Sequence, residues 1–309
     1  MIESVSRLEE RRDESNRQEL VSRIAGTIRE DGTVEALPGL HLYRVSSPTD
    51  RIYGASRLSL CVIAQGAKTV TLGDKEYRYD AERYLLATVE LPVVGRIVEA
   101  SPELPYLSLR LDLDPMLVGS VMVEAGIPVP QGHGDAKAIV VSTLDSALLD
   151  AVVRLLRLID SPTEARVIGP LLKREIVFRL LMCEQGGRLR HLPALGGHSH
   201  RIAQAIDRLQ KSFDQPLRIE SLAQELGMSS SGFHHHFKAV TDMSPLQFQK
   251  QLRLQEARRL MLSEEFDAAS AGYRVGYDDA SHFSRDYKKH FGQSPMRDVE
   301  RLRTMPIAE

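Results

Sequence analysis

Two short segments of the chain carry hydrogen-bonding and basic side chains at matching positions, 50 residues apart. Ser231 and Lys238 in the first segment correspond to Ser281 and Lys288 in the second. Hydroxyl and basic side chains donate hydrogen bonds to base edges and phosphate oxygens of nucleic acids. A repeat of this kind indicates one structural unit that is present twice. The chemistry that these residues predict is recognition of a nucleic acid, not catalysis.

A helix, a glycine turn and a second helix are predicted around each segment. The first copy has Ala223 before Gly227, and the second has Gly272 before Gly276. A small residue lets the two helices cross closely, and glycine supplies the backbone freedom that the tight turn needs. This pattern is typical of a helix-turn-helix, whose second helix enters the major groove of DNA.

The second helix of each copy is expected to begin after a capping side chain, Ser229 in the first and Asp279 in the second. The predicted DNA contacts are the outward residues of these helices: Ser230, Ser231, His234, His235 and Lys238 in the first copy, and Ala280, Ser281, Ser284, Arg285, Lys288 and Lys289 in the second. Serine, histidine and above all arginine would contact bases, and the lysines would contact phosphate. Because the two copies offer different side chains, we expect an asymmetric, directional DNA site.

A single long helix is predicted between the two copies. It begins at Ser244-Pro245, with serine as the cap and proline at the first helical position, and continues over Leu246–Ser263. About 18 helical residues span about 27 Å. With a turn at each end, such a helix can hold two recognition helices about 34 Å apart, which is one turn of DNA.

Many positions in this part of the chain follow a known order: Ala223, Gly227, Phe233, Phe237, Lys238, Ser244, Pro245, Arg253, Ala257, Gly276, Tyr277, Phe283, Arg285, Tyr287, Lys288, Gly292, Ser294 and Pro295. With them, residues 199–300 resemble the DNA-binding domain of the AraC/XylS family of bacterial transcription regulators. Asp242 stands where that family usually has glycine, and aspartate tolerates a left-handed backbone. His234-His235-His236 replaces a mixed polar run. Adjacent helical residues point about 100° apart, so these histidines cannot chelate one metal ion from one face.

The N-terminal half changes to short segments rich in β-branched and aromatic residues. Seven strands are predicted: His41–Val45, Leu58–Ile63, Lys68–Leu72, Lys75–Tyr79, Arg83–Ala87, Gly95–Glu99 and Tyr106–Leu111. Their close spacing indicates a small sandwich or barrel. Leu60–Lys68, Tyr77–Asp80 and Leu91–Gly95 resemble the cupin-like N-terminal domain of a subgroup of the same family. That resemblance implies a domain that senses a small molecule, with dimerisation through adjoining helices.

The expected fold class is therefore α+β, with four regions along the chain. They are a polar N-terminus and helix (1–34), a cupin-like effector-sensing β-barrel (35–114), a helical region expected to mediate dimerisation (115–192) and an all-α double helix-turn-helix domain (199–303). Amphipathic helices are predicted over Ser142–Ile159 and Val167–Cys183. Glycine pairs at 186–187 and 196–197 indicate an interdomain linker.

Metal chemistry is not expected in the N-terminal domain. No histidine occurs between His41 and His133, so the closely spaced His and Glu ligands of metal-dependent cupins are missing. We therefore expect no catalytic residues, no metal and no cofactor. Cys61 leaves two alternatives open: a strand cysteine buried as a small hydrophobe, or a thiol that senses electrophiles or oxidants. Lys68 or Arg83 would lower the pKa of a sensing thiol.

The composition and net charge of the chain say more about its cellular compartment than about its function. The 309 residues carry a net charge of −2 and include two cysteines, Cys61 and Cys183. Two cysteines cannot build a disulfide framework, which favours a reducing cytoplasm. No apolar run approaches the roughly 20 residues that span a membrane. The near-neutral charge neither supports nor excludes DNA binding.

These observations predict a cytoplasmic transcription regulator that is not an enzyme. Its expected partners are promoter or operator DNA, a small-molecule effector, a second copy of the chain and RNA polymerase, with no membrane. Activation is the working expectation and repression stays open. The alternative is a cupin-like enzyme or small-molecule carrier whose helical domain binds protein partners. The sequence names neither the effector nor the operator.

Overall fold

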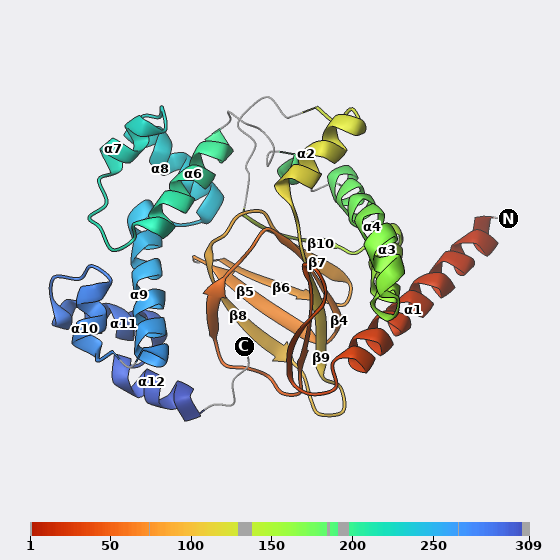
Figure 1. Cartoon of the computed structure of the whole chain (residues 1–309), viewed down its shortest axis with the longest axis horizontal. Coiled ribbons are helices and arrows are strands. Elements are labelled where there is room, and N and C mark those ends of the chain that lie inside the picture. The colour runs from red at the N-terminus through yellow and green to blue at the C-terminus, as the bar shows by residue number, and fades with distance from the viewer. Residues whose placement is uncertain are drawn as a thin grey trace. The chain divides into compact units, whose positions relative to one another are not determined.

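The computed structural model describes residues 2–73, 75–128, 138–183, 186–190, 198–264 and 266–304. They form two compact units that divide between His200 and Arg201 (Figure 1). Most of the predicted linker, residues 191–197, lies outside the described residues. Its first glycine pair does not fit the linker prediction, because Gly186 begins the short helix α5 (Gly186–Leu189). Among the described helices, none combines the length and the apolarity that a membrane crossing requires.

Two antiparallel sheets build the first unit. The six-stranded sheet has the order β1 (Gly32–Leu37), β2 (Leu40–Val45), β9 (Tyr106–Asp112), β4 (Ser59–Gln65), β7 (Arg83–Ala87) and β10 (Ile139–Thr143). The four-stranded sheet has the order β3 (Ile52–Ala55), β8 (Pro92–Glu99), β5 (Ala67–Leu72) and β6 (Lys75–Asp80). The sheets face each other as a small barrel (Figure 1), and the α+β fold class is confirmed.

All seven predicted strands are present, and three further strands were missed. β1 and β3 are mostly exposed edge strands, so they lack the apolar alternation that marks a buried strand. β10 lies in the segment expected to be helical and pairs with β7, from Ile139 opposite Ala87 to Thr143 opposite Arg83. The prediction of a helical region from 115 to 192 is therefore wrong at these residues. A short apolar run does not distinguish a strand from a helix until its partner is known.

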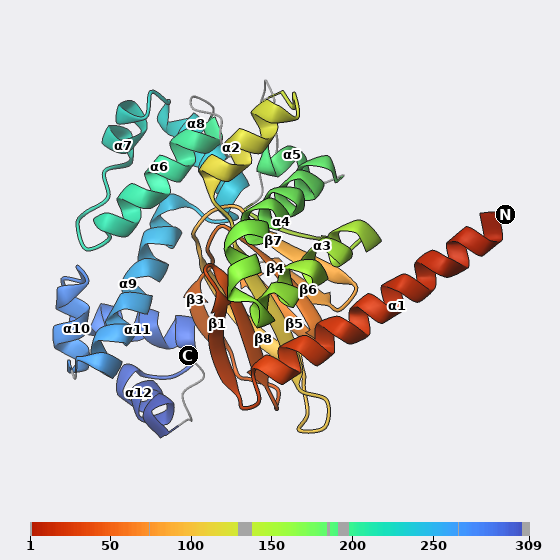
Figure 2. The same cartoon turned by 45° about the vertical axis from the view of Figure 1, so that its right-hand side comes forward.

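Helices cover the outer face of the six-stranded sheet. They are α1 (Ile2–Thr27), α2 (Pro115–Glu124), α3 (Ser146–Arg157) with a 3-10 turn at Leu158–Asp160, and α4 (Pro162–Met182). α3 packs against both α1 and α4. Leu20 and Ile24 of α1 share one core with Leu60 and Leu109 of the sheet. The N-terminal part of α1 extends beyond the sheet (Figure 2).

The second unit is built around one long helix, α9 (Pro245–Ser263). At one end of α9 lie α6 (His198–Lys211), α7 (Ile219–Glu225) and α8 (Ser230–Thr241). At the other end lie α10 (Ala268–Arg274), α11 (Ala280–Phe291) and α12 (Pro295–Thr304) (Figures 1 and 2). The predicted long helix between the two copies is confirmed. It starts with a capping box in which Ser244 accepts from the Gln247 backbone and the Gln247 side chain accepts from Ser244.

Candidate nucleic-acid interface

The first helix-turn-helix comprises α7 and α8. Gly227 adopts a left-handed φ of 63° in the turn, a conformation that a side chain would strain. Ala223 is buried at the crossing of the two helices. Ser229 caps α8 by accepting from the backbone N–H of Gly232 at 3.2 Å. α8 ends at Asp242, whose φ of 56° confirms the predicted left-handed aspartate.

The second helix-turn-helix, α10 and α11, repeats this design with one change. Gly276 has a φ of 91°, and Asp279 caps α11 by accepting from the backbone N–H groups of Ser281 and His282. These hydrogen bonds hold the pKa of Asp279 below its usual range. Gly272 replaces the alanine of the first copy, and a Cβ there would lie 2.9 Å from the Phe283 ring. Gly272 is therefore required by the close packing of α10 on α11, which the sequence alone did not indicate.

The predicted DNA contacts lie on the outer faces of α8 and α11. Aromatic side chains hold the opposite faces in the core, namely Phe233 and Phe237 of α8 and Phe283, Tyr287 and Phe291 of α11. Eight of the predicted residues are exposed: Ser231, His234, His235, Lys238, Ser281, Arg285, Lys288 and Lys289. Ser230, Ala280 and Ser284 are half-buried. The two copies therefore present their polar faces at the same helical phase.

A buried ion-pair network fixes α11 on α9 and α12. The carboxylate of Asp298, which is fully buried, accepts from the Tyr287 hydroxyl at 2.9 Å. Arg258 of α9 contacts the same carboxylate at 2.8 Å and Arg301 at 3.1 Å. Burial raises the pKa of Tyr287 and keeps its hydroxyl protonated as a donor. Breaking one partner would leave an uncompensated buried charge, so this network is costly to disturb.

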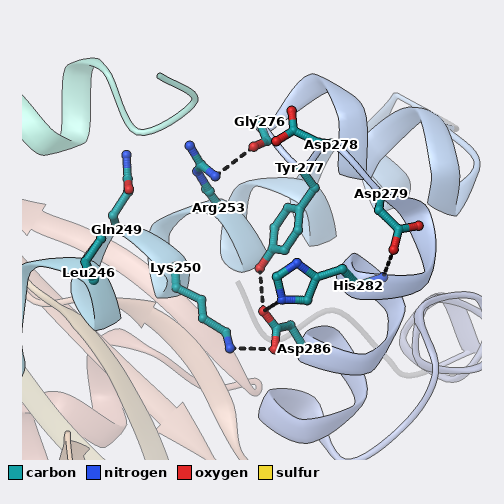
Figure 3. A pocket seen from close by; sticks show the side chains of 10 residues that line it. All are labelled: Leu246, Gln249, Lys250, Arg253, Gly276, Tyr277, Asp278, Asp279, His282 and Asp286. Carbon is teal, nitrogen blue, oxygen red and sulfur yellow. Dashed lines mark hydrogen bonds and ion pairs between the residues drawn. The ribbon is translucent and has the colours of Figure 1, made fainter. Parts of the chain in front are cut away.

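A second polar seam surrounds the turn of the second helix-turn-helix (Figure 3). Arg253 of α9 donates to the carbonyl oxygens of Gly276 at 2.7 Å, Phe213 at 2.7 Å and Gln215 at 3.1 Å. Asp286 of α11 accepts from the Tyr277 hydroxyl at 3.3 Å and pairs with Lys250 at 2.5 Å. A pocket of about 280 Å³ opens between these groups.

The seam was missed by sequence reasoning. In the sequence, Arg253 stands out only through the family resemblance. Asp286 follows the exposed Arg285 of α11 in the sequence, but its own side chain is half-buried. The one sequence signal is charge: Lys250 and Arg253 lie three residues apart on α9, and two acidic residues follow Gly276-Tyr277. The partners of Arg253 come from two separate segments, residues 213–215 and Gly276, so only the tertiary structure reveals them.

The three adjacent histidines of α8 differ in their exposure. His234 and His235 are exposed and His236 is half-buried, as the helical phase predicts. Among the described residues, no group of three or more His, Cys, Asp or Glu is arranged to hold a metal ion.

Cys61 lies on β4 in the barrel and is half-buried. Burial raises the pKa of its thiol, and the nearby Lys68 charge opposes that rise. The Ser59 hydroxyl lies 3.9 Å from its sulfur. Arg83 is not among the groups that shift this pKa, whereas Arg110 is. A neutral thiol is a poor nucleophile, so this environment favours the small-hydrophobe alternative.

Comparison with known proteins matches both halves of the chain. The family model described as the AraC-type transcriptional regulator N-terminus matches residues 36–188, and a helix-turn-helix domain model matches residues 222–301. The HTH-type transcriptional regulator ArgR of Pseudomonas aeruginosa is 25% identical over 149 residues, 48% of this chain and 45% of ArgR. The HTH-type transcriptional activator RhaS of Escherichia coli is 26% identical over 161 residues, 52% of this chain and 57% of RhaS. The chain thus spans about half the length of these curated relatives.

Solved structures support the fold over a larger share. ToxT from Vibrio cholerae bound to (E)-4-(8-methylnaphthalen-1-yl)but-3-enoic acid superposes with a TM-score of 0.55 at 13% identity, covering 85% of this chain and 98% of ToxT. ToxT bound to an unsaturated fatty acid gives a TM-score of 0.50 at 12% identity, covering 88% of this chain and 97% of ToxT. At such identities the similarity concerns the fold alone.

Proposed function

The chain belongs to the AraC/XylS family of transcriptional regulators, and from this premise we propose that it is a sequence-specific, effector-responsive DNA-binding regulator and not an enzyme. The observation that carries the proposal is the pair of exposed, donor-rich faces on α8 and α11, at the same phase of two helix-turn-helix units. Such faces fit two successive segments of the major groove. The regulator would act on promoter or operator DNA in the cytoplasm.

Different side chains on the two helices have different roles in this proposal. Ser231, His234 and His235 of α8 contact bases in one segment, and Ser281, Ser284 and Arg285 of α11 contact bases in the next. Arg285 donates two parallel hydrogen bonds to guanine. Lys238, Lys288 and Lys289 contact phosphates, which raises affinity for every sequence.

Dimerisation is proposed through α2 and α4 of the first unit. Large apolar side chains on these neighbouring helices are exposed: Met116 and Val123 on α2, and Val167, Ile168, Leu171, Phe178 and Met182 on α4. Exposed apolar side chains gathered in this way favour a protein partner. A second copy of the chain can cover these side chains with its own α2 and α4, so that both sides of the interface are the same surface.

The effector is proposed to bind in the barrel of the N-terminal unit. ToxT, which shares the fold, binds organic acids. Binding there would shift how the first unit constrains DNA binding by the second, and so control activation with RNA polymerase as a further partner. Cys61 is assigned a packing role, so Cys61→Ser should keep full induction of a reporter. Loss of induction in a folded, DNA-binding Cys61→Ser protein would instead establish a thiol sensor.

Gel shifts of the full chain with genomic DNA fragments test the central proposal. A sequence-selective complex that weakens steeply with salt is expected. The alternative function, a cupin-like enzyme or carrier with a protein-binding helical domain, predicts no such complex. Chromatin immunoprecipitation would then identify the target genes, and transcript levels with and without the protein would show whether they are activated or repressed.

A further inference from the structure

The barrel of the N-terminal unit contains two basic side chains that come from opposite sheets. Lys68 lies on β5 of the four-stranded sheet, and Arg110 lies on β9 of the six-stranded sheet. Direct strand partners share a face of an antiparallel sheet, so Arg110 faces the same way as its partner Cys61, and Lys68 the same way as its partner Tyr79. The charges of Lys68 and Arg110 both act on the Cys61 thiol, which places all three in one region between the sheets.

Positive charge exceeds negative charge in this region. The carboxylate that acts on Cys61 is Asp112, and it is already contacted by Arg110 Nε at 3.0 Å and His41 Nε2 at 3.2 Å. Within the described ranges of the chain, the ammonium group of Lys68 makes no hydrogen bond or ion pair. Burial accordingly lowers the pKa of Lys68. A half-buried ammonium without a partner costs free energy, and proteins rarely retain one without a use.

The surroundings of Lys68 leave room for its side chain and add aromatic walls. A Cβ on Gly95, on the neighbouring strand β8, would lie 3.1 Å from Lys68 Cε, so glycine at this position accommodates the lysine stem. The guanidinium of Arg110 lies 5.9 Å from the centre of the Tyr43 ring. Tyr79 and Tyr106 are both buried. Cys61, Lys68, Tyr43 and Arg110 nevertheless stay partly exposed.

We propose that this region is a binding site for a small organic acid, whose carboxylate lies between Lys68 and Arg110 and whose apolar body contacts Tyr43 and Tyr79. The proposal rests on the effector-binding function above and specifies the chemical class of the effector. A carboxylate supplies the single negative charge that the region lacks and can accept from both cations. The aromatic rings provide an apolar wall for the rest of the ligand. A phosphate is less suited, because no helix N-terminus or run of backbone N–H groups is among the groups described above.

Thermal unfolding of the purified full chain tests the site with matched probes. The probes are benzoate against benzamide, octanoate against octanamide, and inorganic phosphate. At least one carboxylate is expected to raise the melting temperature, while its neutral amide and phosphate do not. Lys68→Met should weaken the apparent affinity for that acid at least tenfold. Lys75→Met, on the exposed neighbouring strand β6, is the matched control and should respond as the wild type does.

A second measurement needs no ligand. Without any acid, Lys68→Met should melt at a higher temperature than the wild type, because it removes a half-buried cation whose ammonium has no partner. A lower melting temperature would show that Lys68 is a structural residue and would overturn the proposal. Equal stabilisation by acid and amide, stabilisation by phosphate alone, or no response to either acid would also overturn it.

Gel shifts with the same proteins separate this proposal from the proposed function. Lys68→Met should bind DNA as tightly as the wild type and lose only its response to the acid. A chain that binds the acid through Lys68 and forms no selective DNA complex would contradict the regulator function and leave the acid site standing. A chain that binds DNA selectively and does not bind the acids would contradict the acid site and leave the regulator function standing.

Discussion

Arg253 of α9 donates a 2.7 Å hydrogen bond to the carbonyl oxygen of Gly276, the residue that forms the turn of the second helix-turn-helix. The same guanidinium donates to carbonyl oxygens of Phe213, Asp214 and Gln215, in the segment between α6 and α7. A Cβ on Gly276 would lie 2.1 Å from the Asp214 carbonyl oxygen, so the two segments are in close contact. Arg253 thus links the segment that precedes the first helix-turn-helix to the turn of the second.

Replacement of Arg253 by lysine is expected to weaken both recognition helices together. Lysine keeps the charge but cannot reach four carbonyl oxygens with a planar fork. The unfolding free energy should fall by about 2 kcal/mol or more, because several carbonyl groups lose a charged donor. Denaturant unfolding measures this loss, and footprinting measures protection of both DNA segments. Arg259→Lys on the exposed side of α9 is the control and should change stability by less than about 1 kcal/mol. Loss of footprint protection over only one DNA segment would show that Arg253 does not link the two helix-turn-helix units.

Arg285→Ala is expected to relax specificity in one half of the DNA site. Loss of a bidentate guanine contact costs about 1–3 kcal/mol of discrimination at that base pair. Lys288→Ala should instead weaken binding to all sequences alike and make the salt dependence shallower by about one counterion. Gel shifts with single-base operator variants over a range of salt distinguish the two effects. An unchanged footprint for Arg285→Ala would refute the assignment of α11 as a recognition helix.

Gly272→Ala is expected to destabilise the second helix-turn-helix although alanine is the better helix former. Its Cβ would lie 2.9 Å from the Phe283 ring, and overpacking of this kind costs about 1–3 kcal/mol. The reciprocal change in the first copy, Ala223→Gly, should cost about 1 kcal/mol through helix propensity. Thermal or denaturant unfolding of both variants provides the comparison. A more stable Gly272→Ala protein would show that α10 and α11 can move apart.

Stability should fall at acidic pH partly because of His290. Burial, with the Arg258 and Lys250 charges, lowers the pKa of His290 from 6.5 to about 4. The unfolded chain binds a proton on this histidine below about pH 6.5, whereas the folded chain does so only near pH 4. This contribution to stability is therefore complete above pH 6.5 and is lost as the pH falls towards 4, by about 3 kcal/mol in total. Denaturant unfolding from pH 7.5 to 4.5 should give a flatter curve for His290→Gln. Parallel curves for the two proteins would exclude this role.

Charge on the exposed face of α4 is expected to disrupt the proposed dimer. Leu171 and Phe178 are 58% and 42% exposed in the single chain, so Leu171→Asp or Phe178→Asp should leave the fold intact. Each would bury a charge in the proposed interface and shift the protein to monomers in light scattering. Arg166→Asp, at an exposed position on the same helix, is the matched control. If all three variants remain dimeric, another surface mediates the association.

The sequence alone determined the local design of the second unit. The repeat, the caps at Ser229 and Asp279 and the left-handed Asp242 depend on residues within one or two helical turns, so spacing predicts them. The seven strands with apolar alternation were found for the same reason. These features were sufficient for the fold class, and the ordered positions from Ala223 to Pro295 carried the resemblance to the family.

Only the tertiary structure decided the features that join distant segments. β10 is a strand because it pairs with the edge of β7. Gly272 is required because Phe283 packs against it. Arg253 donates to carbonyl oxygens that lie in separate loops. Lys68 and Arg110 likewise come into one region because two sheets close on each other. Such contacts depend on long-range packing, which overrides local preference and leaves no regular spacing in the sequence.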